Sequence, residues 1–228
     1  MGMFNYIKSK LGSEKDKDVP ATEQFYTPLR IALHSTLDIR TVDLIMLKDN
    51  MHPAMVIPKG QCEVMAIGKF SLDGTPVHQV YLRDSSGEEF TLQIAEGKDY
   101  RSQKPTVEEI LLFKQIVALE PETEASLERA LSNIGFSDIE IDDVRYERIW
   151  GDPFTEKMEF RKFNEQIITP GETKNFTDEY ILYGRTIQDI TGESQPEFLL
   201  VGLEEEDTGA QLAMHVGIKI NVTDVVVQ

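Results

Sequence analysis

The stretch Gln211–Thr223, QLAMHVGIKINVT, decides the fold class of this 228-residue chain. Every second residue of it is apolar, and these residues are Leu212, Met214, Val216, Ile218, Ile220 and Val222. The residues between them point the other way and include His215 and Lys219. A period of two places alternate side chains on opposite faces of a strand. The stretch therefore predicts a long, half-buried β-strand.

A three-stranded antiparallel meander is predicted earlier in the chain. Apolar alternation marks strands over 62–70, 77–83 and 90–94. The turn sequences Leu-Asp-Gly-Thr at 72–75 and Asp-Ser-Ser-Gly at 84–87 separate them, and short glycine-containing loops of this kind join hairpin strands.

Further strands are predicted in the second half of the chain, over 157–168, 179–187 and 196–204. Before them, Ile139 and Ile141 alternate, and the pattern then slips by one residue before Val144 and Tyr146. Because a one-residue slip exchanges the two faces of a strand, we predict a β-bulge at the Asp142-Asp143 pair.

Two helices are predicted between residues 105 and 135. In the first, Thr106 and Glu109 have the spacing of a capping box, and an apolar stripe runs from Val107 to Val117. The second begins near Pro121 to Thr123 and ends at Gly135, because glycine readily adopts the left-handed conformation that ends a helix.

The predicted fold class is α+β, mainly β. Antiparallel strands form a barrel or sandwich arrangement, with the two central helices and a short N-terminal helix. Residues 1–20 are predicted to be an amphipathic segment and flexible linker, and residues 21–228 a β-rich domain. That domain is either one unit or two subdomains, 21–104 and 136–228, bridged by the helices at 105–135.

The N-terminal segment leaves several interpretations open. Met3 or Phe4, Ile7 and Leu11 lie at helical spacing, with two lysines beside them, before a charged run at 13–18. The segment is a frayed terminus, a helix packed on its own domain, or a weak peripheral membrane contact through residues 3–11.

Composition restricts the partners and the compartment. The chain has 23 Lys and Arg against 40 Asp and Glu, a net charge of −17, so we expect no nucleic-acid partner. The single cysteine, Cys62, fits a reducing compartment and a small buried side chain. No secretory signal is visible, and no apolar run approaches the roughly 18 residues of a membrane span. We therefore predict a cytoplasmic protein without a transmembrane segment.

Motifs that carry chemistry are missing from the sequence. The four histidines, His34, His52, His78 and His215, lie far apart and lack zinc-ligand spacing. No phosphate-binding loop and no nucleophile elbow is present. We therefore predict no catalytic residue, no metal site and no cofactor. A non-enzymatic protein is favoured over an enzyme.

Six residues are candidates for an interaction site. Tyr146, Trp150 and Phe154 surround a Gly-Asp-Pro turn, where exposed aromatic side chains would anchor a partner or, alternatively, Trp150 would pack at a strand end. Asp142 and Asp143 belong to the acidic cluster 140–143, which, like the cluster 204–207, suits either a cation or a solvated turn. His215, with acids near Asp142 or Glu204, would form a site assembled from distant strands.

The whole chain after the linker resembles the YjfK-like family of bacterial proteins of unknown function. The resemblance rests on the segments Pro28–Ile31, Val64–Phe70, Tyr81–Asp84, Phe90–Ala95 and Arg148–Trp150. It implies no catalytic residues. Genes of this family tend to lie beside those for a phage-shock-protein-A-like membrane-stress protein, which implies an accessory role in an envelope-stress system with that protein as a partner.

Two functional hypotheses result. The leading one is a non-enzymatic interaction or accessory protein of the cytoplasm. The alternative is a small-ligand or metal-binding protein, or an enzyme, whose site is assembled from distant strands.

Overall fold

The computed structural model describes residues 27–98, 105–121, 123–206 and 209–228, and the protein is mainly β. Within these residues twelve strands join one sheet in which the paired neighbours run antiparallel. The strands are β1 Thr36–Ile39, β2 Gln61–Leu72, β3 Thr75–Arg83, β4 Glu89–Lys98, β5 Pro105–Leu119, β6 Asp138–Ile141, β7 Val144–Arg148, β8 Arg161–Thr169, β9 Glu172–Gln188, β10 Ser194–Glu206, β11 Gly209–Lys219 and β12 Val225–Val227. The helical elements are α2 Val42–Leu47, α3 Glu124–Leu131 and the 3-10 turn η1 Val222–Asp224. The predicted N-terminal helix and linker lie outside the described residues.

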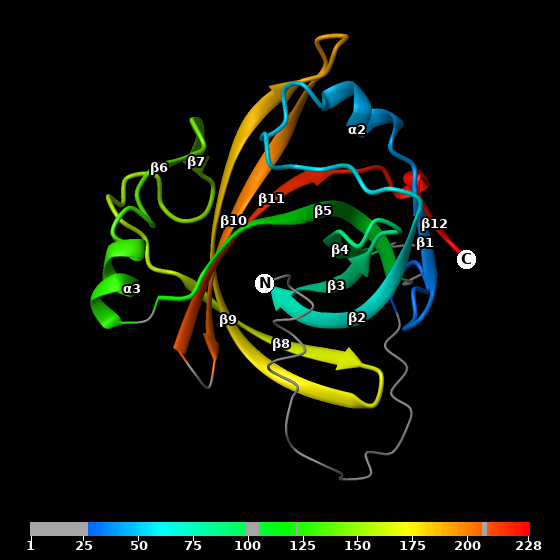
Figure 1. Cartoon of the computed structure of the whole chain (residues 1–228), viewed down its shortest axis with the longest axis horizontal. Coiled ribbons are helices and arrows are strands. Elements are labelled where there is room, and N and C mark those ends of the chain that lie inside the picture. Colours follow the sequence, from blue (N-terminus) through cyan, green and yellow to red (C-terminus); the bar gives the residue numbers. More distant parts are fainter. Residues whose placement is uncertain (1–26, 99–104, 122, 207–208) are drawn as a thin grey trace.

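The sheet bends until eight of its strands form a circuit. The order is β12-β1-β2-β3-β4-β5-β11-β10-β9-β7-β6, and β8 pairs with both β2 and β9 (Figure 1). The circuit closes weakly, because β8 meets β2 only from the Ile67–Ile168 pair to the Lys69–Gln166 pair. Strands β1 and β7 take up other parts of the same edges of β2 and β9. The antiparallel prediction is therefore confirmed, whereas the arrangement is not a clean barrel.

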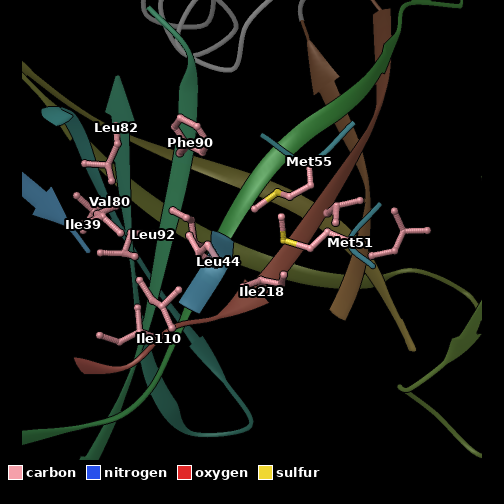
Figure 2. Close-up of a cluster of buried hydrophobic side chains, with 14 of the residues drawn as sticks. Ile39, Leu44, Met51, Met55, Val80, Leu82, Phe90, Leu92, Ile110 and Ile218 are labelled. Carbon is pink, nitrogen blue, oxygen red and sulfur yellow. The ribbon is translucent and has the colours of Figure 1, made fainter. Parts of the chain in front are cut away.

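Each strand of the circuit has an outer and an inner face. The outer face carries the large apolar core, which the segment 27–58, α2 and the β6–β7 hairpin help to cover. Figure 2 shows part of it, with Leu44, Met51 and Met55 among side chains of β3, β4, β5 and β11. The inner face carries smaller clusters around Phe163 and Tyr81.

Residues 211–219 of the stretch that predicted the fold belong to β11, and its apolar side chains up to Ile220 are buried in the outer core. Val222 lies in η1 and is 46% exposed. The prediction of a half-buried strand is wrong, because residues 211–218 are buried on both faces. His215, opposite Leu200 on β10 and Gln115 on β5, lies on the inner face of the circuit.

The first predicted helix is also wrong, because Pro105–Leu119 is strand β5. It pairs with β4 on one side and β11 on the other, so one sheet runs from the first half of the chain to the second. Residues 110–113 are all buried. A strand buried on both faces has a continuous apolar run, and such a run also contains the spacing of a helical stripe.

The predicted bulge at Asp142-Asp143 is a hairpin turn instead. Ile141 pairs with Val144, which leaves two residues in the loop between β6 and β7. Their φ angles are 50° and 63°, the sign that both central residues of a type I′ turn require. Asp tolerates this conformation better than most residues that have a Cβ.

Other predictions agree with the structure. Strands β2, β3 and β4 form the expected meander. Helix α3 begins after Thr123, whose side chain accepts from the Ser126 amide while Ser126 caps in return. The helix ends at Leu131, four residues before the predicted end at Gly135, and a turn leads from there to Gly135, whose φ is 97°. None of the described helices has the length and hydrophobicity that crossing a membrane requires.

Candidate functional site

A pocket of about 200 Å³ lies on the inner face of the sheet. Five aromatic side chains line it: Phe70, Trp150, Phe163, Tyr180 and Phe198. Aliphatic side chains add Leu72, Val77, Ala95, Leu111, Leu182 and Leu200. Gln93 and Glu109 complete the lining at neighbouring positions of β4 and β5. Strands β2, β3, β4, β5, β8, β9 and β10 all contribute, so the curvature of the sheet creates the pocket.

The aromatic side chains are grouped around Phe163 of β8. Its ring centroid lies 5.6 Å from that of Phe70, 5.7 Å from that of Trp150 and 6.1 Å from that of Tyr180. The Phe70 contact is edge-on, with an interplanar angle of 65°. These separations are those of favourable aromatic pairs. The four rings therefore hold one another in place, and we call them the aromatic wall of the pocket.

Trp150 reaches the pocket because the loop after β7 is anchored at several points. The Arg148 guanidinium donates to the carbonyl oxygens of Gly135, Asp152 and Thr155, the last at 2.6 Å. The amide of Trp150 donates to the Leu182 carbonyl on β9. The loop therefore holds Trp150, half-buried, against the inner face rather than leaving it in solvent.

One cation already contacts this aromatic wall. The guanidinium carbon of Arg161 lies 5.0 Å from the Trp150 centroid and 5.7 Å from the Phe163 centroid. Its Nη2 also lies 2.5 Å from Oδ1 of Asp73 in the β2–β3 turn. The pair joins the start of β8 to that turn beside the pocket.

The polar end of the pocket has a single charge. Glu109 is the only residue of the described lining whose side chain is charged at neutral pH, since the phenol of Tyr180 is neutral there. Its carboxylate lies 3.3 Å from Nζ of Lys219, and the two side chains are 38% and 50% exposed. Exposed pairs of this kind contribute little stability, so a ligand can compete for the carboxylate.

The structure separates the six candidate residues that the sequence suggested. Trp150 lines the pocket, whereas Phe154 is 95% exposed. Tyr146 is fully buried on the outer face, and Asp142 and Asp143 are exposed in the hairpin turn. Their role in interactions stays a prediction.

The pairing of His215 with acids near Asp142 or Glu204 stays a prediction, because the side chain of Glu204 lies outside those that the structure describes. No ion pair of His215 occurs in the described part of the chain, and Asp142 lies beside His52, with 3.9 Å between Oδ2 and Nε2. Burial lowers the pKa of His215 to about 4. Its Nδ1 is buried without a hydrogen-bond partner among the residues that the structure describes.

A second polar cluster, on the outer face, was not predicted at all. The carboxylate of Glu197 is fully buried and accepts from the Tyr146 hydroxyl, Nε of Arg185 and the His52 amide. Burial and the charge of Glu197 raise the pKa of Tyr146. The sequence did contain a signal for this cluster, since Glu197 is a carboxylate within the otherwise apolar stretch 196–203. A carboxylate at such a position is rarely buried without partners.

Groups of His, Cys, Asp and Glu that could hold a metal ion are not found within the described ranges. Cys62 is buried in the outer core, and burial raises the pKa of its thiol to about 12, so it is a poor nucleophile.

Fold and site together define an antiparallel β protein with a small aromatic pocket inside its curved sheet. Over residues 6–226 the chain matches the family described as "Protein of unknown function (DUF2491)", and it belongs to that family. This agrees with the resemblance to an uncharacterised YjfK-like family. Comparison with curated proteins and with solved structures gave no match.

Proposed function

We propose that this protein binds a small, largely apolar molecule in the pocket around Phe163 and Trp150. The observation that carries the proposal is a concave space of about 200 Å³ with an aromatic and aliphatic lining. An engineered apolar cavity of roughly 150 Å³ suffices to bind benzene. The space therefore suits one aromatic ring, with room for a short chain leading toward the opening.

Burial of apolar surface supplies the affinity. Ligand sites are typically lined by apolar and aromatic side chains, with a few polar groups that orient the ligand. Gln93 and Glu109 are such groups at this pocket. The arrangement favours binding over catalysis, because no nucleophile with an adjacent base is among the described lining residues.

Calorimetric titration with phenylbutanol tests the proposal. The native chain should bind it saturably with a 1:1 ratio. Ala95→Leu, which fills the pocket, should weaken binding at least about tenfold, whereas Ala118→Leu should not. Ala118 is a fair control because it is partly buried like Ala95 but does not line the pocket.

Saturable binding that both variants retain would place the ligand elsewhere. A native chain that takes up no phenylbutanol would contradict the proposal directly. A circular dichroism spectrum of each variant shows whether the sheet is intact.

A second candidate function is the accessory role expected from the family resemblance. The exposed side chain of Phe154, in the same anchored loop as Trp150, favours a protein partner there. The phage-shock-protein-A-like partner, the envelope-stress system and the cytoplasmic location stay predictions. Binding of that purified protein to the native chain, lost in Phe154→Ser, would support the role, and no binding at near-physiological salt would oppose it.

A further inference from the structure

We propose that the molecule bound in this pocket is an organic cation, an amine or quaternary ammonium compound with an apolar body. The inference rests on the proposed function and adds the charge of the ligand. Three features favour a positively charged ligand: the aromatic wall, the carboxylate at the polar end of the pocket and the net negative charge of the whole chain.

The aromatic wall favours a positive group. The faces of aromatic rings carry partial negative charge and attract cations that lie within about 6 Å of the ring centroid. Phe70, Trp150 and Tyr180 contact Phe163, so several rings line one small space. Groups of rings like this are used to bind quaternary ammonium compounds.

The protein itself places a cation on this wall. Arg161 lies over Trp150 and Phe163 at distances that a cation–π contact requires. The contact shows that two rings of the aromatic wall already hold one positive group at cation–π distance. The carboxylate of Asp73, 2.5 Å from the Arg161 guanidinium, neutralises its positive charge. Arg161 therefore does not favour an anionic ligand in the pocket.

The charge at the polar end has the sign that an ammonium group needs. Glu109 supplies a carboxylate at the lining, and the described lining residues include no Lys or Arg. Lys219 is the present partner of Glu109, but both side chains are partly exposed and the pair is easily exchanged.

The whole chain adds a long-range preference. A net charge of −17 raises the local concentration of cations and lowers that of carboxylates at its surface. Fatty acids and other apolar anions, which would otherwise suit an aromatic pocket, are therefore disfavoured.

Three ligands with one body and different head groups test this inference: phenylbutylamine, phenylbutanol and phenylbutyrate. Calorimetry at low salt should give the highest affinity for the amine, about tenfold above the alcohol, and the lowest for the carboxylate. Glu109→Gln should bring the affinity for the amine close to that of the alcohol. Glu108→Gln removes the same charge from an exposed position of β5 and should preserve the preference for the amine.

The outcomes separate the two proposals. If the alcohol binds in the pocket as well as the amine does, or if Glu109→Gln and Glu108→Gln behave alike, the charge assignment is wrong and the binding function stands. If none of the three ligands binds, the proposed function fails and this inference fails with it.

Discussion

The hydroxyl of Tyr146 donates to Oε2 of Glu197 at 2.9 Å, and both side chains are fully buried. The same carboxylate accepts from Arg185 of β9 and from the amide of His52. One buried charge thus ties the β6–β7 hairpin, strands β9 and β10 and the segment before β2 together. Because a buried charge is tolerated only with partners, each of these donors should be important for stability.

Removing the Tyr146 hydroxyl should destabilise the protein. Tyr146→Phe leaves Glu197 with one donor fewer in a site that water does not reach, which should lower the free energy of unfolding by about 1 to 3 kcal/mol. Urea unfolding followed by circular dichroism measures it. In a double-mutant cycle with Glu197→Gln, the two changes should be coupled by about 1 kcal/mol, and strict additivity would show that the contact has no energetic weight.

His215 should make stability depend on pH in mildly acidic solution. Its folded-state pKa is about 4, below the ordinary value of 6.5, because burial disfavours the imidazolium. The unfolded chain therefore binds a proton that the folded chain refuses, and stability falls as the pH is lowered from about 6.5 to about 4. A shift of this size corresponds to about 3 kcal/mol.

His215→Gln removes this titration and provides the comparison. Unfolding free energies measured from pH 7 down to pH 4 should fall less steeply for the variant than for the native chain. Carboxylates that titrate in the same range affect both proteins equally. Parallel curves would mean that folding does not change the pKa of His215.

The turn between β6 and β7 should be improvable. Asp143 has a φ of 63°, which costs a residue with a Cβ more than it costs glycine. Asp143→Gly should therefore raise the unfolding free energy by about 0.5 to 1 kcal/mol, as Asp-Gly is a preferred type I′ sequence. Thermal unfolding would show it as a higher midpoint, and a lower midpoint would mean that the Asp143 side chain makes a stabilising contact.

Local patterns predicted much of the sheet. The meander of β2 to β4 and the capped start of α3 depend on turn residues and alternation that act within a few positions. The break in the apolar alternation at Asp142-Asp143 was also visible in the sequence. A β-bulge and a two-residue hairpin turn both produce such a break. The choice between them depends on strand pairing, which the pattern does not contain.

The errors have a common cause in the closed circuit of strands. Strands β5 and β11 are buried on both faces, so β5 lost the alternation that marks a strand and β11 was expected to have one solvated face. Which strands enclose the inner face depends on the contacts of β8 with β2 and β9. The contacts of β8 with β9 are local, whereas those with β2 join residues about 100 positions apart, such as Ile67 and Ile168.

The site was predicted only in part. Trp150 stood out as the single tryptophan beside a turn, and it does line the pocket. Phe70, Phe163 and Glu109 were ordinary strand residues in the sequence, because their convergence comes from the curvature of the sheet. Glu197 was overlooked as one acid among many.

Emission of Trp150 gives the most direct measurement of the central claim that a small ligand occupies this pocket. Because the chain has one tryptophan, its fluorescence reports on this wall alone. Titration with phenylbutylamine should shift the emission saturably, with the dissociation constant found by calorimetry, and Ala95→Leu should abolish the shift. Calorimetric binding without any change in Trp150 emission would contradict the claim, because the ligand would then bind elsewhere.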